Sequence, residues 1–120
     1  MSKAAVSVFV FSIYLYALGL ILVAFPNTLL ALFRIPETTE VWIRVVGMLV
    51  LIIGFYYTTA AQNDLTAFLR ATVYARFAVL AFFAVFALTG FAPPVLVLFG
   101  VVDAAAATWT GFALRAQSPA

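Results

Sequence analysis

Cysteine and histidine are both absent from the 120 residues of this chain. Without cysteine there are no disulfides, thiol nucleophiles or thiolate metal ligands, and without histidine the usual imidazole ligands to metals and haem are missing. No histidine is present to activate a serine as a nucleophile. We therefore expect no catalytic residue and no metal site, and we predict a protein that is not an enzyme.

Charged residues are also scarce. They make up 8% of the chain, whereas an ordinary soluble domain has about 25%, and the mean hydropathy is +1.23. Such a chain cannot cover its own surface with polar groups in water. Its net charge of +2 is too small and too dispersed for binding nucleic acid. The composition indicates an integral membrane protein, and the length indicates a single domain over residues 1–120.

Long stretches without charge mark the candidate membrane spans, because a span needs about 20 mostly apolar residues. Turn and helix-breaking residues separate these stretches. The predicted fold is an all-α membrane protein, an antiparallel bundle of four transmembrane helices over 4–25, 41–61, 65–89 and 94–114. The first span is longer than the apolar core of a signal peptide, about 7–15 residues, so we expect it to be retained.

The connections between the spans carry their own signals. Residues 27–35 are too apolar for a solvated loop, and Pro36 follows them, which predicts a short interfacial helix with Asn27 as its N-cap. Asp64 is expected to cap the third span. Pro93 and Pro94 are expected to begin the fourth span, since proline is tolerated in a first helical turn.

Basic residues predict the orientation. Four spans place both termini on one side, together with Lys3, Arg70 and Arg115, whereas Arg34 and Arg44 lie on the other side. The small excess of basic residues favours termini in the cytoplasm.

Asp103 is the most informative residue, because it lies inside the fourth span, about 14–17 Å from either end. A bare carboxylate there costs several kcal/mol and must be paired, protonated or hydrated. Arg76 in the third span lies at about 18 Å from the cytoplasmic side and Asp103 at about 16 Å, so we predict an ion pair, which Tyr14 at about 16 Å can join. The pair is either a strut that sets helix register or a site where Asp103 exchanges a proton or holds a polar or cationic ligand.

Four residues near the ends of the spans are candidates for contact with the membrane interface or with lipid headgroups: Arg34, Trp42, Arg44 and Arg70. Arginine at such a position ordinarily extends its charge to the interface, and tryptophan sits in the aromatic belt. Arg44 can instead pair with Glu40 or bind an anionic ligand.

Small residues recur at helical spacing in the second and fourth spans, which allows close helix contact. They are Gly47, Gly54, Gly100, Ala104, Ala107 and Gly111. They can serve packing within the bundle or contact with a partner protein. The third span is rich in phenylalanine, which faces lipid or fills gaps, although a bound lipid, quinone or carotenoid can also stack there.

Two parts of the chain carry a resemblance: YALGLILVAFPNTLLALFRIPETTEVWIRVVGMLVLIIGFYYTTAAQND and, more weakly, ALTGFAPPVLVLFGVVDAAAATWTGFAL. A first helix ended by proline, a short apolar segment and a W-x-R-x-x-G opening, here Trp42, Arg44 and Gly47, resemble the small bacterial four-helix membrane proteins of the DoxX-like group. The resemblance covers most of the chain. Some members accompany quinone-linked oxidoreductases, which implies an accessory subunit, and no catalytic residue is carried over.

Three functions remain open. The first is an accessory or scaffold subunit of a larger membrane complex, for example a quinone-linked redox or other energy-converting one. The second is a small homodimeric carrier of hydrophobic or cationic compounds that uses Asp103, although small multidrug exporters place their carboxylate in the first helix, which here has no acidic residue. The third is a bundle in which Asp103, Arg76 and Tyr14 line a pocket open to lipid and do acid–base chemistry.

Overall fold

The structure is a computed structural model that describes residues 1–117. These residues form five α-helices and no β-strand. The four long helices are α1 (Lys3–Ala24), α3 (Trp42–Gln62), α4 (Thr66–Leu88) and α5 (Leu96–Gln117), and the short helix is α2 (Pro26–Leu32).

Each of the four long helices is long and apolar enough to cross a membrane, with mean hydropathies between 1.6 and 2.4 over the best window. Helices satisfy every backbone N–H and C=O within one segment, which the hydrocarbon core of a bilayer requires. The predicted fold class is confirmed: this is an all-α integral membrane protein with four spans and a short helix between the first two.

The helix ends differ from the predicted ends by one to three residues, and two predicted caps are wrong. Helix α2 begins at Pro26, and the Asn27 side chain instead accepts from the Thr38 N–H at 2.9 Å and donates to its carbonyl at 3.0 Å. Asp64 has a left-handed φ of 47° and accepts from the Ser2 N–H at 2.9 Å. Both side chains form hydrogen bonds with other segments of the chain and therefore do not cap the nearby helices.

Helix α5 begins at Leu96, two residues later than the prediction that Pro93 and Pro94 start it. The carbonyls of Pro93 and Pro94 accept hydrogen bonds from Leu96 and Val97 at 3.1 and 3.0 Å, which makes a tight turn ahead of the helix. The later start places Asp103 closer to this end of the helix than the sequence suggested.

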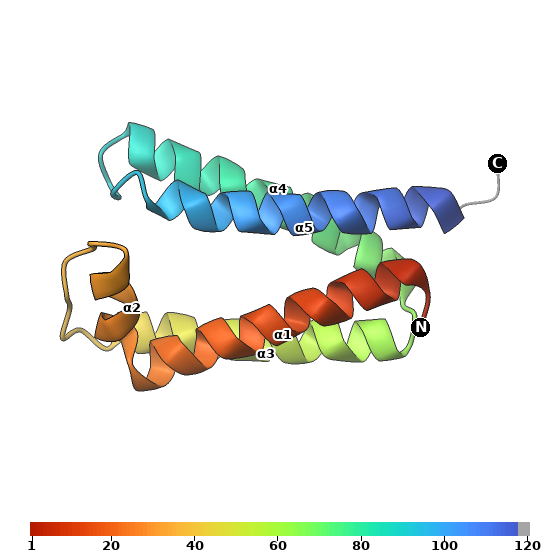
Figure 1. Cartoon of the computed structure of the whole chain (residues 1–120), viewed down its shortest axis with the longest axis horizontal. Helices are drawn as coiled ribbons and strands as arrows, with labels where there is room; N and C mark the ends of the chain where they lie inside the picture. The colour runs from red at the N-terminus through yellow and green to blue at the C-terminus, as the bar shows by residue number, and fades with distance from the viewer. Residues whose placement is uncertain (118–120) are drawn as a thin grey trace.

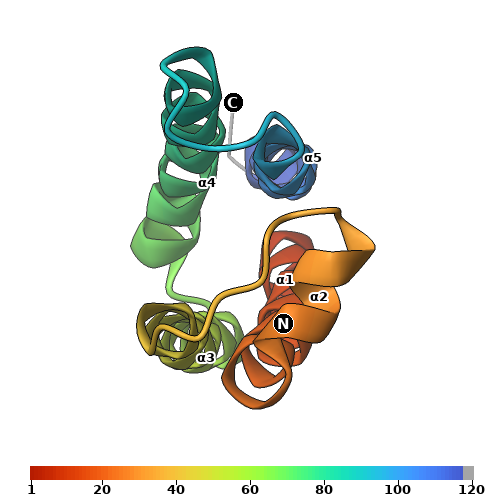
Figure 2. The same ribbon diagram turned by 90° about the vertical axis from the view of Figure 1, so that its left-hand side faces the viewer.

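The long helices form two pairs, α1 against α3 and α4 against α5, and α1 also contacts α5 (Figure 1). Viewed end on, the α4–α5 pair lies above the α1–α3 pair (Figure 2). The consecutive helices α3 and α4 meet at their turn and then diverge (Figure 1). The two pairs converge near the N-terminus and separate toward α2.

Glycine brings α1 and α3 together. A Cβ atom on Gly47 would lie 2.8 Å from Cβ of Leu22, and one on Gly19 would lie 2.7 Å from Cγ of Leu51. On the same helix pair, a Cβ atom on Gly54 would lie 3.2 Å from Cε1 of Tyr16. Such distances leave no room for a side chain, so the backbones approach closely. Gly19 shares this packing role although the sequence pattern did not single it out.

Small residues also line the contact between α4 and α5. A Cβ on Gly100 would lie 2.8 Å from Cα of Leu80, whereas one on Gly111 would lie 3.8 Å from Cγ1 of Val73. Ala107 is fully buried and Ala104 is half-buried. In this chain the small-residue positions therefore contact neighbouring helices of the same bundle.

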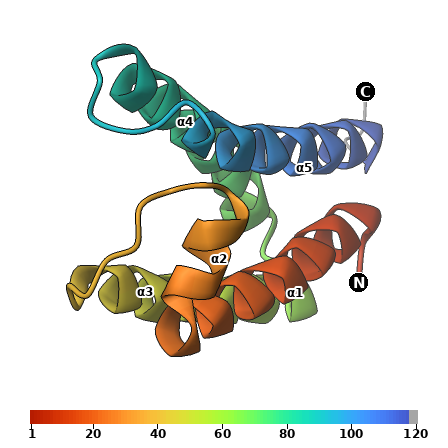
Figure 3. The same cartoon turned by 60° about the vertical axis from the view of Figure 1, so that its left-hand side comes forward.

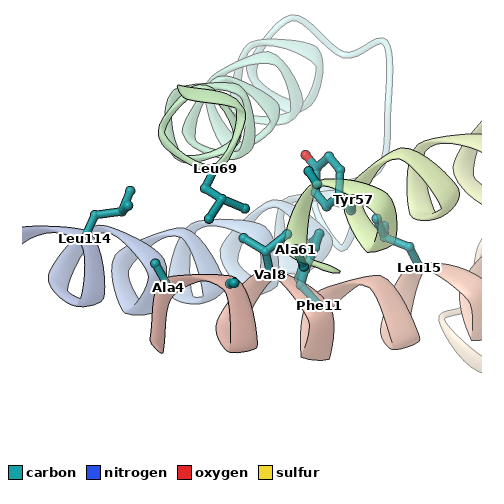
Figure 4. Packing of buried hydrophobic residues seen from close by; sticks show 10 residues of the cluster. Ala4, Val8, Phe11, Leu15, Tyr57, Ala61, Leu69 and Leu114 are labelled. Atoms are coloured by element: carbon teal, nitrogen blue, oxygen red, sulfur yellow. The ribbon is translucent and has the colours of Figure 1, made fainter. Parts of the chain in front are cut away.

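The buried core lies at the end of the bundle that holds the N-terminus (Figure 4). It draws on four helices and consists of Ala4, Ala5, Val8, Phe11, Leu15, Tyr57, Ala60, Ala61, Leu69 and Leu114. At the opposite end α2 lies between the two helix pairs (Figure 3), and the Phe33 ring just after it packs edge-on against Phe99 of α5, with centroids 4.9 Å apart. The helix pairs are thus closed at both ends, with space left between them.

Candidate functional site

A cavity of about 410 Å³ occupies this space. All five helices contribute to its wall, which consists of leucine, isoleucine, valine, alanine and phenylalanine except at four positions. Those four are Tyr14 on α1, Tyr57 on α3, Arg76 on α4 and Asp103 on α5. Three of them, Asp103, Arg76 and Tyr14, are residues that the sequence placed in one intramembrane group.

Arg76 is almost completely buried, with 1% of its surface exposed. Its Nε donates to the Thr72 carbonyl at 3.1 Å, and its Nη2 donates to the hydroxyls of Thr72 at 3.0 Å and Thr110 at 2.9 Å. The Thr110 hydroxyl in turn lies 2.7 Å from that of Ser7 on α1. Nη1 has no hydrogen-bond partner within residues 1–117. Hydroxyls from three helices therefore hold the guanidinium in one orientation.

Aromatic rings also stabilise the buried charge. The centre of the guanidinium, Cζ, lies 4.9 Å from the Phe11 ring centroid and 6.0 Å from that of Tyr57. A cation near the face of such rings gains about 0.5–2 kcal/mol, most when water is excluded. Part of the cost of burying this arginine is thus offset without a carboxylate.

Arg76 and Asp103 line the same cavity but are not joined by a hydrogen bond, because Nε and Nη2 bind threonines and Nη1 binds nothing. Helical side chains lean toward the N-terminus of their own helix. Arg76 bonds to Thr72, four residues earlier, and so leans toward the end where the N-terminus lies; since α5 is antiparallel to α4, Asp103 is expected to lean toward α2. The two side chains therefore diverge.

Their depths differ as well. Asp103 lies seven residues after Leu96 and Arg76 lies twelve residues before Leu88, at the same end of the bundle. At the rise of an α-helix these separations are about 10 Å and about 18 Å. The matched depth expected from the sequence does not hold, because the fourth helix begins and ends later in the chain than expected.

The two tyrosines complete the polar part of the wall. Tyr14 is half-buried and packs against Phe11 with ring centroids 5.3 Å apart. Tyr57 is buried and packs 6.0 Å from the same ring. The phenol groups and the Asp103 carboxylate can all exchange hydrogen bonds with a molecule in the cavity.

Sequence reasoning missed the actual partners of Arg76. Thr72 lies four residues before Arg76, and this i, i+4 spacing on one helix could have been noticed. Thr110 accepts from Arg76, and Ser7 bonds to Thr110; neither residue carries such a signal, because only the pairing of α5 with α4 and α1 brings them to this position. Tyr57 lies on α3, and only the packing of α3 against α1 brings it to the cavity.

The candidate interface residues have separate roles. Arg44 donates from Nη1 to the carbonyl of Val23 and so satisfies the end of α1. Arg34 adopts a left-handed φ of 57° after α2, where the Ile35 N–H bonds to the Leu30 carbonyl at 2.8 Å, a helix-ending motif.

Two further interface residues lie on exposed surfaces. Trp42 begins α3 and is 67% exposed, in keeping with an aromatic residue at a membrane boundary. Arg70 is exposed on α4 and lines a second, smaller pocket beside α5.

Comparisons of this chain with family models, curated proteins and solved structures give no match. The geometry of the cavity is therefore the basis on which a function can be proposed.

Proposed function

We propose that this protein binds a neutral hydrophobic ring compound with hydroxyl groups, of the quinol class, in the cavity between its helix pairs. The observation that carries this proposal is the cavity itself. It is apolar over most of its wall, yet it holds a carboxylate at Asp103, a guanidinium at Arg76 and phenols at Tyr14 and Tyr57. This combination, an apolar body with a few convergent polar groups, is typical of ligand sites.

The size of the cavity suits such a ligand. Small-molecule sites enclose about 300–1,000 Å³, and this cavity has about 410 Å³. Phe33, Phe83 and Phe99 in its wall offer ring faces for stacking. If side chains had filled the space between the helix pairs, a ligand there would be excluded. They instead leave the cavity open.

Charge balance favours a neutral ligand over a cationic one. Arg76 keeps its proton in proteins, so the cavity contains one positive charge and, with Asp103 ionised, one negative charge. A neutral hydroxyl can donate to Asp103 and leave this balance intact. A cationic ligand would add a second positive charge in a medium of low dielectric constant, where such repulsion is strong.

In the membrane, we propose that the protein serves as an accessory subunit that holds this ligand for a larger complex, such as a quinone-linked redox complex. Membership of the DoxX-like group belongs to this proposal and is supported by the proline-ended first helix, the short α2 and the Trp42, Arg44 and Gly47 pattern. We also propose a location in the bacterial cytoplasmic membrane with cytoplasmic termini. The orientation rests on Lys3 and Arg70, which lie toward the end of the helices that holds the N-terminus.

A homodimeric carrier is the second candidate. It is favoured by one observation, that Asp103 lines a cavity between the membrane-spanning helices. A carrier of this kind would bind a lipophilic cation at the carboxylate of Asp103. The charge balance described above argues for the quinol instead.

A binding titration of the purified protein tests whether its ligand is a quinol. The protein would be reconstituted in lipid nanodiscs and titrated with a short-tailed ubiquinol, with its oxidised quinone in a parallel titration, and binding read from quenching of intrinsic fluorescence. We expect saturable binding of the quinol that weakens at least tenfold in Asp103→Leu, because the hydroxyl loses its acceptor. The control is Asp64→Asn, which removes the other aspartate, in an exposed turn, and should leave binding unchanged.

Two results would contradict the proposal that the cavity binds a quinol. One is the absence of saturable binding. The other is binding of tetraphenylphosphonium, a lipophilic cation, that is stronger than quinol binding and is lost in Asp103→Leu, which would favour the carrier.

Extraction in mild detergent, followed by native gel electrophoresis and mass spectrometry of the band, tests the accessory role. A large band with defined partner subunits would support it. A band that contains this chain alone would support the homodimeric carrier.

A further inference from the structure

A second pocket, of about 280 Å³, lies on the surface between α4 and α5. It is lined by Arg70, Val73 and Tyr74 of α4 and by Gly111, Leu114 and Arg115 of α5. Two guanidinium groups from neighbouring helices thus share one pocket, and none of its lining residues is acidic. This arrangement is independent of the cavity described above.

We propose that this pocket binds the phosphate of an anionic phospholipid. Two arginines in one pocket repel each other, and an anion between them removes this repulsion. The planar guanidinium donates two parallel hydrogen bonds to a phosphate, which makes arginine suited to this task. The phenol of Tyr74, 73% exposed, can add an O–H donor to a phosphate oxygen.

The depth of the pocket matches that of a lipid headgroup. Arg70 lies four residues after the first residue of α4, and Arg115 lies two residues before the last residue of α5. These separations are about 6 Å and about 3 Å along the helix axes, and the antiparallel helices place both at the same end of the bundle. Phosphates at a bilayer boundary lie just outside the hydrocarbon core, at the level of the helix ends.

The apolar part of the pocket favours a lipid over free phosphate. Val73 and Leu114 lie beside the arginines, where the glycerol and the start of an acyl chain would follow a bound headgroup. Gly111 keeps this region open, because its missing side chain leaves space up to Val73. A soluble phosphate would use the arginines and gain nothing from these residues.

The site is separable from the cavity. Arg70 and Arg76 are six residues apart on α4 and point to different faces of the helix. Arg70 and Arg115 are exposed, whereas Arg76 is buried. Substitutions at the pocket should therefore leave both the fold and ligand binding in the cavity unchanged.

Native mass spectrometry of the detergent-solubilised full chain tests the proposal. Phosphatidylglycerol and phosphatidylcholine would be added in separate titrations, and inorganic phosphate would be added as a competitor in a third. We expect one phosphatidylglycerol to be retained at least tenfold more tightly than phosphatidylcholine. Arg70→Gln combined with Arg115→Gln should reduce this retention at least tenfold.

The matched control is Lys3→Gln, compared with Arg70→Gln and Arg115→Gln as single substitutions. Each removes one positive charge at the same end of the bundle, and only Lys3 lies outside the pocket, so Lys3→Gln should retain the lipid. Gly111→Leu provides a second test, because it fills the pocket without changing the charge and should also abolish retention. Thermal unfolding of each variant confirms that it is folded.

Three outcomes would overturn the proposal. Equal loss in the control variant would show general attraction between charges. Equal retention of phosphatidylcholine would show that the phosphate charge is not recognised. Displacement of the lipid by equimolar inorganic phosphate would show a site for free anions.

Discussion

The hydroxyl of Thr110 on α5 accepts a hydrogen bond of 2.9 Å from Nη2 of Arg76 on α4. The same hydroxyl lies 2.7 Å from the hydroxyl of Ser7 on α1. This contact joins the two helix pairs at a buried position and satisfies a charge without a carboxylate. A guanidinium that would otherwise need a counter-ion is held by neutral groups and by the rings of Phe11 and Tyr57.

Replacing Thr110 with valine should destabilise the fold, because one N–H of Arg76 Nη2 loses its buried acceptor, whereas Ser7 keeps its bond to the Ala4 carbonyl. A buried polar group left without a partner costs about 1–3 kcal/mol, and more if it is charged. We expect the free energy of unfolding in detergent to fall by about that amount, measured by circular dichroism. Thr108→Val is the control, since exposed Thr108 bonds only to the Ala104 carbonyl of its own helix. Equal losses in both variants would contradict the role of Thr110.

A double-mutant cycle tests whether Asp103 and Arg76 are coupled. Removing one partner of a buried ion pair typically costs 3–5 kcal/mol. Since no hydrogen bond joins these residues, we expect Asp103→Asn to change the free energy of unfolding by less than about 1 kcal/mol. The effect should be similar in the Arg76→Gln background. A loss of several kcal/mol that disappears in that background would show that the two form a pair.

The two glycines of α5 should respond differently to alanine. In Gly100→Ala the new Cβ would lie 2.8 Å from Cα of Leu80, so the backbones of α4 and α5 must separate. Overpacking of this kind costs about 1–3 kcal/mol. In Gly111→Ala the new Cβ would lie 3.8 Å from Val73, an ordinary contact, and alanine favours the helix by about 1 kcal/mol. Thermal midpoints that shift in opposite directions would confirm this difference, and a lower midpoint for Gly111→Ala would contradict it.

Acid should weaken the contact between the N-terminus and the turn after α3. Hydrogen bonds from Ser2 lower the pKa of Asp64 below its usual value of 3.8, and the N-terminal charge contributes. Because the pKa is lower in the folded state, the stabilisation is complete above the unfolded pKa of about 3.9 and is lost as the pH falls through the folded pKa. The thermal midpoint of the wild type should exceed that of Asp64→Asn at pH 6, and the difference should disappear as the pH falls through the folded-state pKa of Asp64. A difference that does not depend on pH would contradict this assignment.

The helices themselves were predictable because few backbone conformations are stable in the hydrocarbon core of a membrane. Every N–H and C=O in the hydrocarbon core must be bonded within the chain, so a long uncharged stretch forms a helix whatever its neighbours. The four spans and the short helix after Pro26 follow from this. The helix ends were less predictable, since the side chains of Asn27 and Asp64 bond to Thr38 and Ser2, on other segments, and neither caps the start of a helix.

The cavity group was predictable in part. Counting residues along rigid helices brought Asp103, Arg76 and Tyr14 to one region, because the rise per residue is constant. Counting could not give the direction in which each side chain leans, nor the later start of α5 at Leu96. For this reason the partners of Arg76 are hydroxyl groups and not the carboxylate.

The sequence by itself determined that the chain is helical, crosses a membrane and carries two opposite charges inside it. Only the tertiary structure decided that α1 pairs with α3 and α4 with α5, that Thr110 bonds to both Arg76 and Ser7, and that Arg70 and Arg115 share a pocket. The physical reason is that these helices are apolar on all sides, so no stripe of hydrophobic residues marks the face to be buried. In lipid the faces are chosen by close packing at small residues and by a few hydrogen bonds, and both depend on which helix lies opposite.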